Sequence, residues 1–207
     1  NGKRKLQSTK NHKFLTLNGG WKRLDELKIG DAILSNYIEQ PYHSVLNDAQ
    51  NDIVIGSILG DGNLSKISLN VCRLRVIHGE KQFDYIEWKS QFFNCKCEYL
   101  DKNGFSQKPA KRFQSKGFFC DYTKKSAIEK LNIRSLSIAW MDDGSLSING
   151  DGRLYSFAND FSLINQLCVK INSIIGTNGK VQKSKSTTSG NEYFYIWFSV
   201  TDMKILS

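Results

Sequence analysis

The chain is poor in the residues that mark several common classes of protein. Its 207 residues include only two prolines, which argues against extended linkers between domains. No apolar run approaches the roughly 20 residues that a membrane-spanning helix requires, and no apolar segment near the N-terminus resembles an export signal. The sequence therefore predicts a globular intracellular protein, in the cytoplasm or in an organelle or nucleus, that is not secreted and does not contact membranes.

Cysteine and histidine are too scattered for a structural zinc site. The five cysteines are odd in number and include no Cys-x-x-Cys pair, since Cys95 and Cys97 are the closest two. The three histidines, His12, His43 and His78, lie far apart. Because zinc sites need four ligands at short, regular spacings, we interpret the cysteines as reduced thiols of an intracellular protein.

Positive charge is in excess and is unevenly distributed. The net charge of +9 favours a polyanionic partner such as nucleic acid. Residues 1–50 carry +3, residues 51–133 carry +5 and residues 134–207 carry +1. Within residues 102–125, seven basic residues accompany a single acidic one, and phenylalanines lie among them. This pattern is typical of strands with one basic and one buried face.

Two parts of the chain follow one plan. An apolar run at residues 52–60 ends in Asp61-Gly62, and another at residues 136–141 ends in Asp142-Asp143-Gly144. Strand-like residues, an amphipathic helix and a basic hairpin follow in each copy: the strands at 73–77 and 153–157, the helices near 83–93 and 161–175. We therefore expect an α+β fold in which the order αββαββ occurs twice, related by a pseudo-twofold axis. Duplex DNA has a matching local symmetry.

The Asp-Gly end of each apolar run has two explanations. Glycine commonly ends helices because it adopts the left-handed conformation, but a carboxylate there faces the negative end of the helix dipole and loses stability. Close packing of the two helices through small residues would bring two carboxylates and free carbonyl groups together. Such a group suits about two or three Mg²⁺ ions and metal-dependent phosphodiester cleavage. The small residues are Gly56 and Gly60 on the first helix and Ser137 and Ala139 on the second.

Both apolar runs also resemble a known motif. Residues 54–62, Val-Ile-Gly-Ser-Ile-Leu-Gly-Asp-Gly, are similar to the LAGLIDADG motif of homing endonucleases. Residues 136–144, Leu-Ser-Ile-Ala-Trp-Met-Asp-Asp-Gly, resemble the second copy in single-chain members, and residues 78–89 resemble the segment after the first motif. The resemblance covers residues 51–207 and implies the duplicated LAGLIDADG endonuclease fold, with halves 51–133 and 134–207.

The resemblance implies a divalent-metal active site. Asp61 and Asp143 would be the catalytic, metal-binding carboxylates, and Gly60 and Asp142 would complete the metal ligands, Asp142 through its backbone carbonyl. The expected ion is Mg²⁺ or Mn²⁺, with no organic cofactor.

In this family a basic residue near the end of each half assists at the scissile phosphate. Lys125, with Lys124 as the alternative, matches that place in the first half. The second half has fewer residues after its helix, so we expect it to be truncated and its basic residue to lie about where the chain stops.

The family's sheets form a saddle over DNA, and their side chains enter the major groove. Carried over to this chain, the contacts would come from basic and polar residues, some reading base edges and others holding phosphates. These residues are Lys66, Arg73, Arg75, His78, Lys108, Lys111, Arg112, Gln114, Lys116, Arg153, Tyr155, Lys180, Lys183 and Lys185. A hydrogen-bonded structural role is the alternative for His78, and Trp88, Trp140 and Trp197 are predicted to be core residues.

The first fifty residues resemble a different family. Thr9-Lys10-Asn11-His12 and the later Gly-Trp-Lys-Arg-Leu-Asp-Glu-Leu-Lys-Ile-Gly-Asp at residues 20–31 are similar to the N-terminal splicing (Hint) region of inteins. There the histidine polarises the scissile peptide bond and the threonine assists, roles that His12 and Thr9 would take. The alternative is a small β module with a surface histidine.

The residues that splicing requires at the two ends of an intein are absent. The chain begins Asn1-Gly2 in place of Cys or Ser, and it ends Ile205-Leu206-Ser207 in place of a His-Asn pair. We therefore expect an internal part of a large intein. Residues 1–50 would form a small all-β Hint-like fragment with a junction at 36–50, and residues 51–207 the nested endonuclease.

Three functions from different classes follow. The first is a monomeric, site-specific homing endonuclease that cuts double-stranded target DNA, with host-protein exteins flanking the full-length intein. The second is a non-cleaving nucleic-acid-binding protein on the same scaffold, such as a maturase or a decayed endonuclease. The third is a self-processing module, which would be incomplete here.

Overall fold

A computed structural model describes residues 9–16, 20–31, 33–34, 45–68, 70–102, 107–157, 159–187 and 190–206. The chain divides into two compact units, residues 1–42 and 43–207. The expected junction at residues 36–50 lies largely outside the described residues, which resume at Val45. No helix in these described ranges is both long and apolar enough to cross a membrane.

The smaller unit contains a three-stranded antiparallel sheet. Strand β1 (Lys13–Thr16) lies between β2 (Trp21–Arg23) and β3 (Ile33–Leu34), and the short 3₁₀ helix η1 (Leu24–Glu26) follows β2. An ion pair of 3.0 Å joins Lys22 to Asp31. This part of the chain contains short strands, and its assignment as an all-β Hint-like fragment stays a prediction.

The larger unit consists of two halves of the same order. The first contains α1 (Asp48–Leu59), β4 (Asn63–Ser68), β5 (Val71–Gly79), η2 (Glu80–Gln82), α2 (Phe83–Gln91), β6 (Glu98–Leu100), β7 (Ala110–Gln114), β8 (Phe118–Phe119) and α3 (Lys124–Glu129). The second contains α4 (Ile133–Asp143), β9 (Gly144–Leu146), β10 (Gly152–Leu154), α5 (Phe161–Ile175), β11 (Lys180–Lys185), β12 (Glu192–Phe198) and α6 (Val200–Leu206). Each half therefore begins αββαββ, as predicted, and the first half adds β8 and α3 and the second α6.

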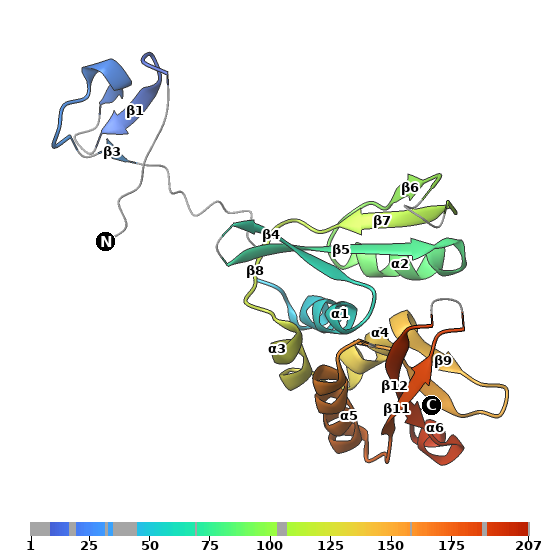
Figure 1. The fold of residues 1–207 in the computed structure, drawn as a ribbon. Coiled ribbons are helices and arrows are strands. Elements are labelled where there is room, and N and C mark those ends of the chain that lie inside the picture. Colours follow the sequence, from blue (N-terminus) through green and yellow to red (C-terminus); the bar gives the residue numbers. More distant parts are fainter. Residues whose placement is uncertain are drawn as a thin grey trace. The chain divides into compact units, whose positions relative to one another are not determined.

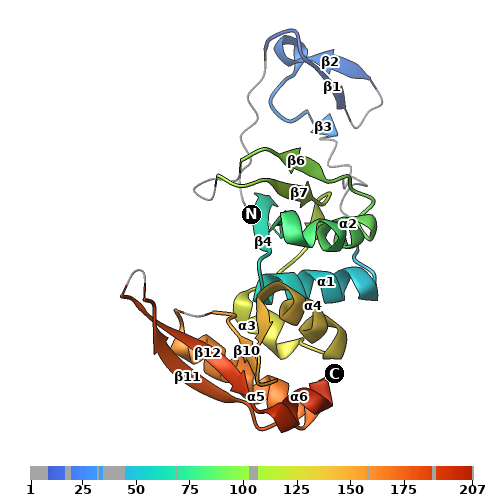
Figure 2. The ribbon, with the colours of Figure 1, turned by 90° about the vertical axis from the view of Figure 1, so that its right-hand side faces the viewer.

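Each half has its own antiparallel sheet. The strand order is β4-β5-β7-β6 in the first half, where β8 also pairs with β5, and β11-β12-β10-β9 in the second. Helices α1 and α4 lie side by side in the middle of the unit, with one sheet beyond each of them (Figures 1 and 2). The C-terminal ends of both motif helices therefore lie between the two sheets.

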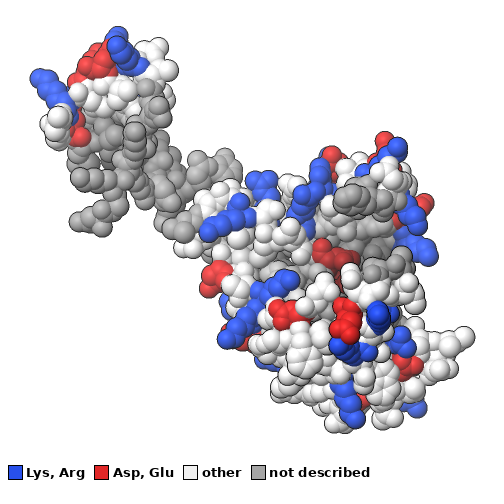
Figure 3. Space-filling model, in the orientation of Figure 1, with Lys and Arg blue, Asp and Glu red and all other residues white. Residues whose placement is uncertain are grey.

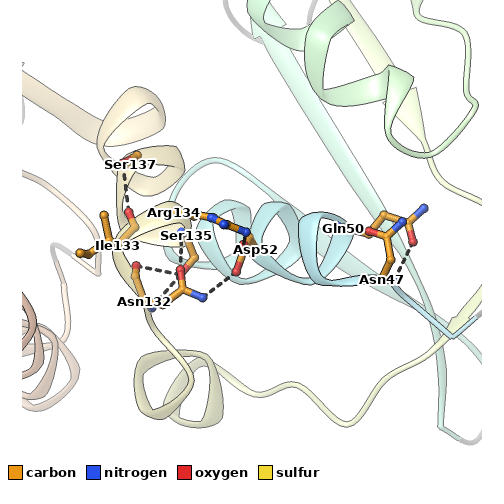
Figure 4. A network of polar contacts seen from close by, with 8 residues as sticks. All are labelled: Asn47, Gln50, Asp52, Asn132, Ile133, Arg134, Ser135 and Ser137. Carbon is orange, nitrogen blue, oxygen red and sulfur yellow. Dashed lines mark hydrogen bonds and ion pairs between the residues drawn. The ribbon is translucent and has the colours of Figure 1, made fainter.

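The motif helices begin earlier than the apolar runs that predict them. Asn47 accepts a hydrogen bond from the Gln50 amide and Asn132 accepts one from the Ser135 amide, so that each asparagine caps its helix. These capping interactions start the helices before the expected residues 52 and 136. Figure 4 shows both caps and a link between the helices, in which Asn132 donates to the buried carboxylate of Asp52 over 2.6 Å.

Glycine on α1 permits the close approach of the two helices. A Cβ atom added to Gly56 would lie 2.5 Å from the Ser135 carbonyl oxygen and 2.6 Å from the Ile138 Cβ. A Cβ atom added to Gly60 would lie 2.4 Å from the Cβ of Asp142. The prediction that Gly56 and Gly60 form the contact is confirmed, because neither position has room for a methyl group.

The prediction that Ser137 lies at the contact between α1 and α4 is wrong. Its side chain is exposed, and its hydroxyl donates to the Ile133 carbonyl over 3.0 Å. Since Gly56 packs against Ser135 and Ile138, the small residue of α4 at this contact is Ser135, two positions earlier. Ala139 is buried in the same cluster as Ile55 of α1, as predicted.

Helix α1 is buried on almost every side because it serves both hydrophobic clusters. Its Ile53 and Val54 pack with the core of the first sheet, whereas Ile55 and Leu59 pack with the core of the second. The amphipathic helices α2 and α5 supply buried residues to the first and second cluster respectively. A helix that is apolar all round is expected in such a central position.

The three tryptophans do not all belong to the core. Trp140 packs on the second cluster with its ring centroid 5.9 Å from that of Phe198. Trp88 is 41% exposed. Trp197 lies opposite Arg153 in the sheet, on the face directed away from the buried residues. The core prediction is therefore wrong for Trp88 and Trp197.

Candidate active site and nucleic-acid interface

The ends of α1 and α4 bring the two predicted carboxylates together. Asp61 follows the last turn of α1, and Asp143 is the last residue of α4. The side chains of Asp61 and Asp143 lie close enough to interact with each other directly. The close packing at Gly60 thus places two carboxylates at one point between the two sheets.

Burial is the main cause that perturbs the titration of this pair. It raises the pKa of Asp143 to about 7, and the negative charges of Asp61 and Asp142 add to the rise. Burial is also the largest cause that raises the pKa of Asp61, and the negative charge of Asp142 is the second largest. Two adjacent carboxyl groups each disfavour the ionised form of the other. A divalent cation relieves the same repulsion, so this donor set fits a metal such as Mg²⁺ or Mn²⁺.

Asp142 lies behind the pair. Its side chain is fully buried and its Oδ1 atom accepts a hydrogen bond of 2.6 Å from the Nζ of Lys89, itself fully buried on α2. The Asp142 carboxylate is therefore engaged with a cation from the other half of the molecule. The metal-binding role predicted for this residue, through its backbone carbonyl, stays a prediction.

His78 lines the same cluster from strand β5. Its Nδ1 lies 3.6 Å from Asp61 Oδ2 and its Nε2 lies 3.5 Å from Asp142 Oδ1. Burial, reinforced by the charge of Lys89, lowers the pKa of His78 to about 4, so the ring is neutral at pH 7. The residue is 2% exposed, which disagrees with a direct contact to DNA, and the hydrogen-bonded structural alternative stays a prediction.

The described residues contain no group of three or more His, Cys, Asp or Glu side chains arranged as a metal site. Asp61 and Asp143 supply two carboxylates, and backbone carbonyls would have to supply the remaining protein ligands. The carbonyl of Gly60, at the end of α1, is one of the ligands predicted from the sequence.

Register separates the predicted DNA-binding residues of the first sheet into two faces. Directly opposite residues of an antiparallel pair share a face. Arg75 pairs with both Asn63 and Gln114, and Arg73 donates to Gln114 over 3.3 Å. Arg112 pairs with Ile77 on the same outward face. The intervening residues of β5 are buried, so these four predicted contacts, Arg73, Arg75, Arg112 and Gln114, line one surface.

The lysines of the first half lie elsewhere. Lys111 pairs in register with His78 on the helix side of the sheet, where it forms an ion pair with Glu87 and its Nζ lies 4.6 Å from the ring of Phe83. Lys66 pairs with Cys72, also on that side, and is exposed. Lys108 and Lys116 are exposed before and after β7. The structure therefore removes Lys111 and Lys66 from the surface formed by the arginines.

The outward face of the second sheet is aromatic. Arg153 pairs with Ser145 and Trp197, and its guanidinium carbon lies 5.5 Å from the Tyr195 ring. Tyr155 packs on the same ring at 5.7 Å. Lys180 also pairs with Trp197 and shares this face. The predicted contacts Arg153, Tyr155 and Lys180 therefore come together.

Lys183 and Lys185 face the other way. They pair with Phe194 and Glu192, and an ion pair of 2.8 Å joins Lys183 to Glu192. The sequence reasoning missed Tyr193, Tyr195 and Trp197 as surface residues. Strict alternation in β12 could have found them, since the intervening Ile196 and Phe198 are the apolar, buried positions.

The two arginines nearest the carboxylates occupy equivalent positions. Asn63 stands two residues after Asp61 and pairs with Arg75. Ser145 stands two residues after Asp143 and pairs with Arg153. The duplicated pattern thus places one arginine beside each motif end.

The predicted catalytic lysines lie in the first turn of α3. Lys124 lines a small pocket with Gly62, Asn63 and Leu64, the residues that follow Asp61, and its Nζ lies 4.9 Å from the ring of Phe157. Lys125 is exposed. The alternative, Lys124, therefore lies beside the first motif end, and the catalytic role of either lysine stays a prediction.

In the smaller unit, Thr9 and His12 form a tight turn. The amide of His12 donates to the carbonyl of Thr9 over 3.0 Å, and both residues are exposed. The imidazole lies 5.0 Å from the Phe14 ring. Their splicing roles stay a prediction.

The larger unit is a duplicated α+β protein. Each αββαββ half has a carboxylate at the end of its central helix, and the two carboxylates form an acidic centre between the two sheets. Residues 51–206 match the model of the LAGLIDADG DNA endonuclease family, so the chain belongs to this family. The predicted resemblance is confirmed at that level.

The chain is also similar to individual proteins and solved structures. The chain is 31% identical over 205 residues to Protein RecA of Mycolicibacterium flavescens, and the alignment covers 93% of this chain and 47% of that protein. It thus spans about half the length of this relative. The homing endonuclease I-WcaI bound to its DNA recognition sequence has a TM-score of 0.59 at 17% identity, with 84% of this chain and 86% of that chain covered. Full-length DUF199/WhiA from Thermatoga maritima has a TM-score of 0.51 at 10% identity, with 79% and 56% covered. At these identities the two structures support the fold.

Proposed function

We propose that the protein is a site-specific endonuclease that hydrolyses phosphodiester bonds in both strands of a DNA target with Mg²⁺ or Mn²⁺. The observation that carries this proposal is the pairing of Asp61 and Asp143 at the adjoining ends of α1 and α4, between two outward sheet faces. Family membership supplies the substrate class. One chain supplies both halves of the site, so the proposed enzyme acts as a monomer.

The carboxylates and nearby backbone carbonyls would hold the metal. Asp61, Asp143 and the carbonyl of Gly60 offer the oxygen ligands that hard divalent cations prefer. When bound, the metal supplies an activated water molecule and stabilises the leaving oxygen of the phosphodiester. The two carboxylates must both be ionised for this role, and neutral His78 and buried Lys89 surround them on the protein side.

The two sheet faces would bind the DNA on either side of the carboxylates. On the face shown in Figure 3, Lys and Arg side chains lie over both halves of the larger unit, with acidic side chains among them. Arg73, Arg75, Arg112 and Gln114 offer hydrogen-bond donors to base edges and phosphates. The second face offers Arg153 with tyrosine rings, whose amphipathic edges suit packing on sugars and bases.

We further propose that this endonuclease belongs to an intein. The similarity of residues 9–31 to a splicing region and the match to part of a protein named RecA support an insertion within a host protein. The host sequences would be the exteins, and a DNA target implies a location inside the cell.

The decisive experiment uses DNA in which the host-gene sequences that flank the full-length intein are joined without interruption. We expect the protein with Mg²⁺ to cut this DNA once and to leave a scrambled control intact. Binding without any cutting, in Mg²⁺ and in Mn²⁺, would contradict the enzyme and favour the non-cleaving scaffold.

The raised pKa of Asp143 makes the metal-free protein sensitive to pH. Because this carboxyl has an ordinary pKa of 3.8 and a folded pKa of about 7, its contribution to stability is present at low pH and is lost between those values as pH rises. In EDTA, the Asp143→Asn variant should therefore gain melting temperature relative to the wild type between pH 5 and pH 8. Differential scanning fluorimetry measures this difference, and a difference independent of pH would oppose the assignment.

Mn²⁺ should act in the opposite direction. Since a proton and the cation compete for the same oxygens, Mn²⁺ should raise the melting temperature more at pH 8 than at pH 5.5. The Asp143→Asn variant should show a small, pH-independent shift.

The register predicts which basic residues bind DNA. Arg75→Ala should weaken binding and lower the slope of log K against log salt concentration by about 1 if the residue contacts phosphate. Lys183→Ala, on the opposite face in a pair with Glu192, is the matched control and should leave both quantities nearly unchanged. Fluorescence-anisotropy titrations measure both quantities. An equal loss of DNA affinity in Arg75→Ala and Lys183→Ala would show that the strand faces are assigned incorrectly.

A further inference from the structure

A buried ion pair crosses from the first half to the second directly behind the acidic centre. Lys89 is 0% exposed, and its Nζ atom lies 2.6 Å from Oδ1 of Asp142, whose side chain is also 0% exposed. Lys89 belongs to α2 and Asp142 to the last turn of α4. Because solvent cannot reach the ammonium group, Lys89 cannot touch a DNA phosphate and is excluded as a catalytic residue.

Other contacts attach the same segment of α2 to α4. The hydroxyl of Tyr85 donates to the Ile138 carbonyl over 3.2 Å, and the Lys89 Nζ lies 4.4 Å from the Tyr85 ring. Gln82 donates to the carbonyl of Met141 over 3.1 Å. Three side chains of the η2–α2 segment therefore hold the end of α4, and Lys89 is the one that carries a charge into the interior.

The second half has no equivalent pair among its described residues. Aligned from their first residues, α2 and α5 have the same buried positions, so that Ile86 corresponds to Ile164 and Lys89 to Leu167. Aligned from Asp61 and Asp143, the residue of α1 that corresponds to Asp142 is Gly60. The ion pair of one half is thus replaced by leucine and glycine in the other.

We infer that Lys89 is a positioning residue that acts through Asp142 on the neighbouring Asp143 and so makes the two ends of the active site unequal. The inference rests on the proposed function. A fixed Asp142 side chain holds the last turn of α4 against the first half, and therefore fixes the backbone that carries the Asp143 carboxylate. In the first half the position that corresponds to Asp142 is Gly60, which has no side chain to make a tie of this kind. The two DNA strands are consequently cut at unequal rates, and the ion pair sets their ratio.

Three variants separate positioning from simple loss of stability. Lys89→Met removes the cation but leaves the Asp142 charge buried, a change that strongly destabilises proteins in general. Lys89→Met combined with Asp142→Asn removes both charges and keeps a folded protein available for measurement. Leu167→Met changes the corresponding buried position of α5 and serves as the matched control.

The test measures cleavage of the target duplex with each strand labelled separately. We expect the double variant to change the ratio of the cleavage rates of the two DNA strands by about tenfold or more. Leu167→Met should lower both rates together, if at all. An unchanged ratio in the folded double variant would overturn the inference and leave Lys89 with a structural role only.

A second readout is independent of cleavage. The Mn²⁺-induced rise in melting temperature should be strongly reduced in the double variant and retained in Leu167→Met, because only the former displaces Asp143. Equal rises in both would contradict the positioning role. A wild-type protein that binds Mn²⁺ but never cuts the flanking-sequence DNA refutes the proposed function, and the thermal measurement still decides the inference.

Discussion

Substitution of Asp61 or Asp143 by asparagine should abolish DNA cleavage while leaving DNA binding intact. Each change keeps the size of the side chain but removes an ionised oxygen that the metal requires. Loss of a group that stabilises developing charge commonly costs about 10²–10³-fold in rate, and we expect at least this loss. Binding should be retained or tightened, because a negative charge is removed from the surface that faces the DNA phosphates.

The appropriate control is Asp101→Asn, which removes a carboxylate from an exposed position after β6. Cleavage rates on the flanking-sequence DNA and anisotropy titrations in Ca²⁺ supply the two measurements. Cleavage that persists in both Asp61→Asn and Asp143→Asn would show that the paired carboxylates are not the metal site.

Substitution of Gly56 by alanine should destabilise the larger unit substantially. The added methyl group would meet the backbone carbonyl of Ser135 at 2.5 Å and the Cβ of Ile138 at 2.6 Å, and neither atom belongs to the end of a flexible side chain. Overpacking of this kind typically costs about 1–3 kcal/mol. For a chain of this size that corresponds to a fall in melting temperature of about 2–4 °C for each kcal/mol. Cleavage should fall further than stability, since the helices that carry the carboxylates would be pushed apart.

Gly79→Ala is the matched control for Gly56→Ala. No atom lies within 4 Å of a Cβ added at Gly79, and its φ of −73° suits alanine. Its melting temperature should stay close to that of the wild type. Equal melting temperatures for the two variants, measured by differential scanning calorimetry, would argue that α1 and α4 are farther apart than described.

Local patterns were sufficient to predict the order of the larger unit. The alternation and helical periodicity of the apolar residues predicted both αββαββ copies, and the glycines at positions 56 and 60 predicted the contact between α1 and α4. They were less informative at the helix starts, because Asn47 and Asn132 cap the helices through side-chain hydrogen bonds that precede the apolar runs.

The face on which each basic residue lies could not be predicted from composition. Lys111 and Arg112 are neighbours in sequence, yet one pairs with Glu87 on the helix side and the other lies on the outward face. The period of two in a strand makes neighbours point in opposite directions, so the direction depends on the register with β5. A count of basic residues in the segment 102–125 therefore overestimates the surface available to DNA.

The sequence by itself determined the two acidic residues at the ends of apolar helices, the duplicated order of elements and the excess of positive charge. These features are local in the chain, so periodicity and short motifs contain them. Only the tertiary structure decided that Asp61 and Asp143 lie together, that His78 lies beside them, and that Lys89 reaches Asp142 across 53 positions of sequence. Lys89 shows the physical reason most clearly. In sequence it is one lysine on an amphipathic helix, and only the packing of α2 against α4 removes it from water and pairs it with a buried carboxylate.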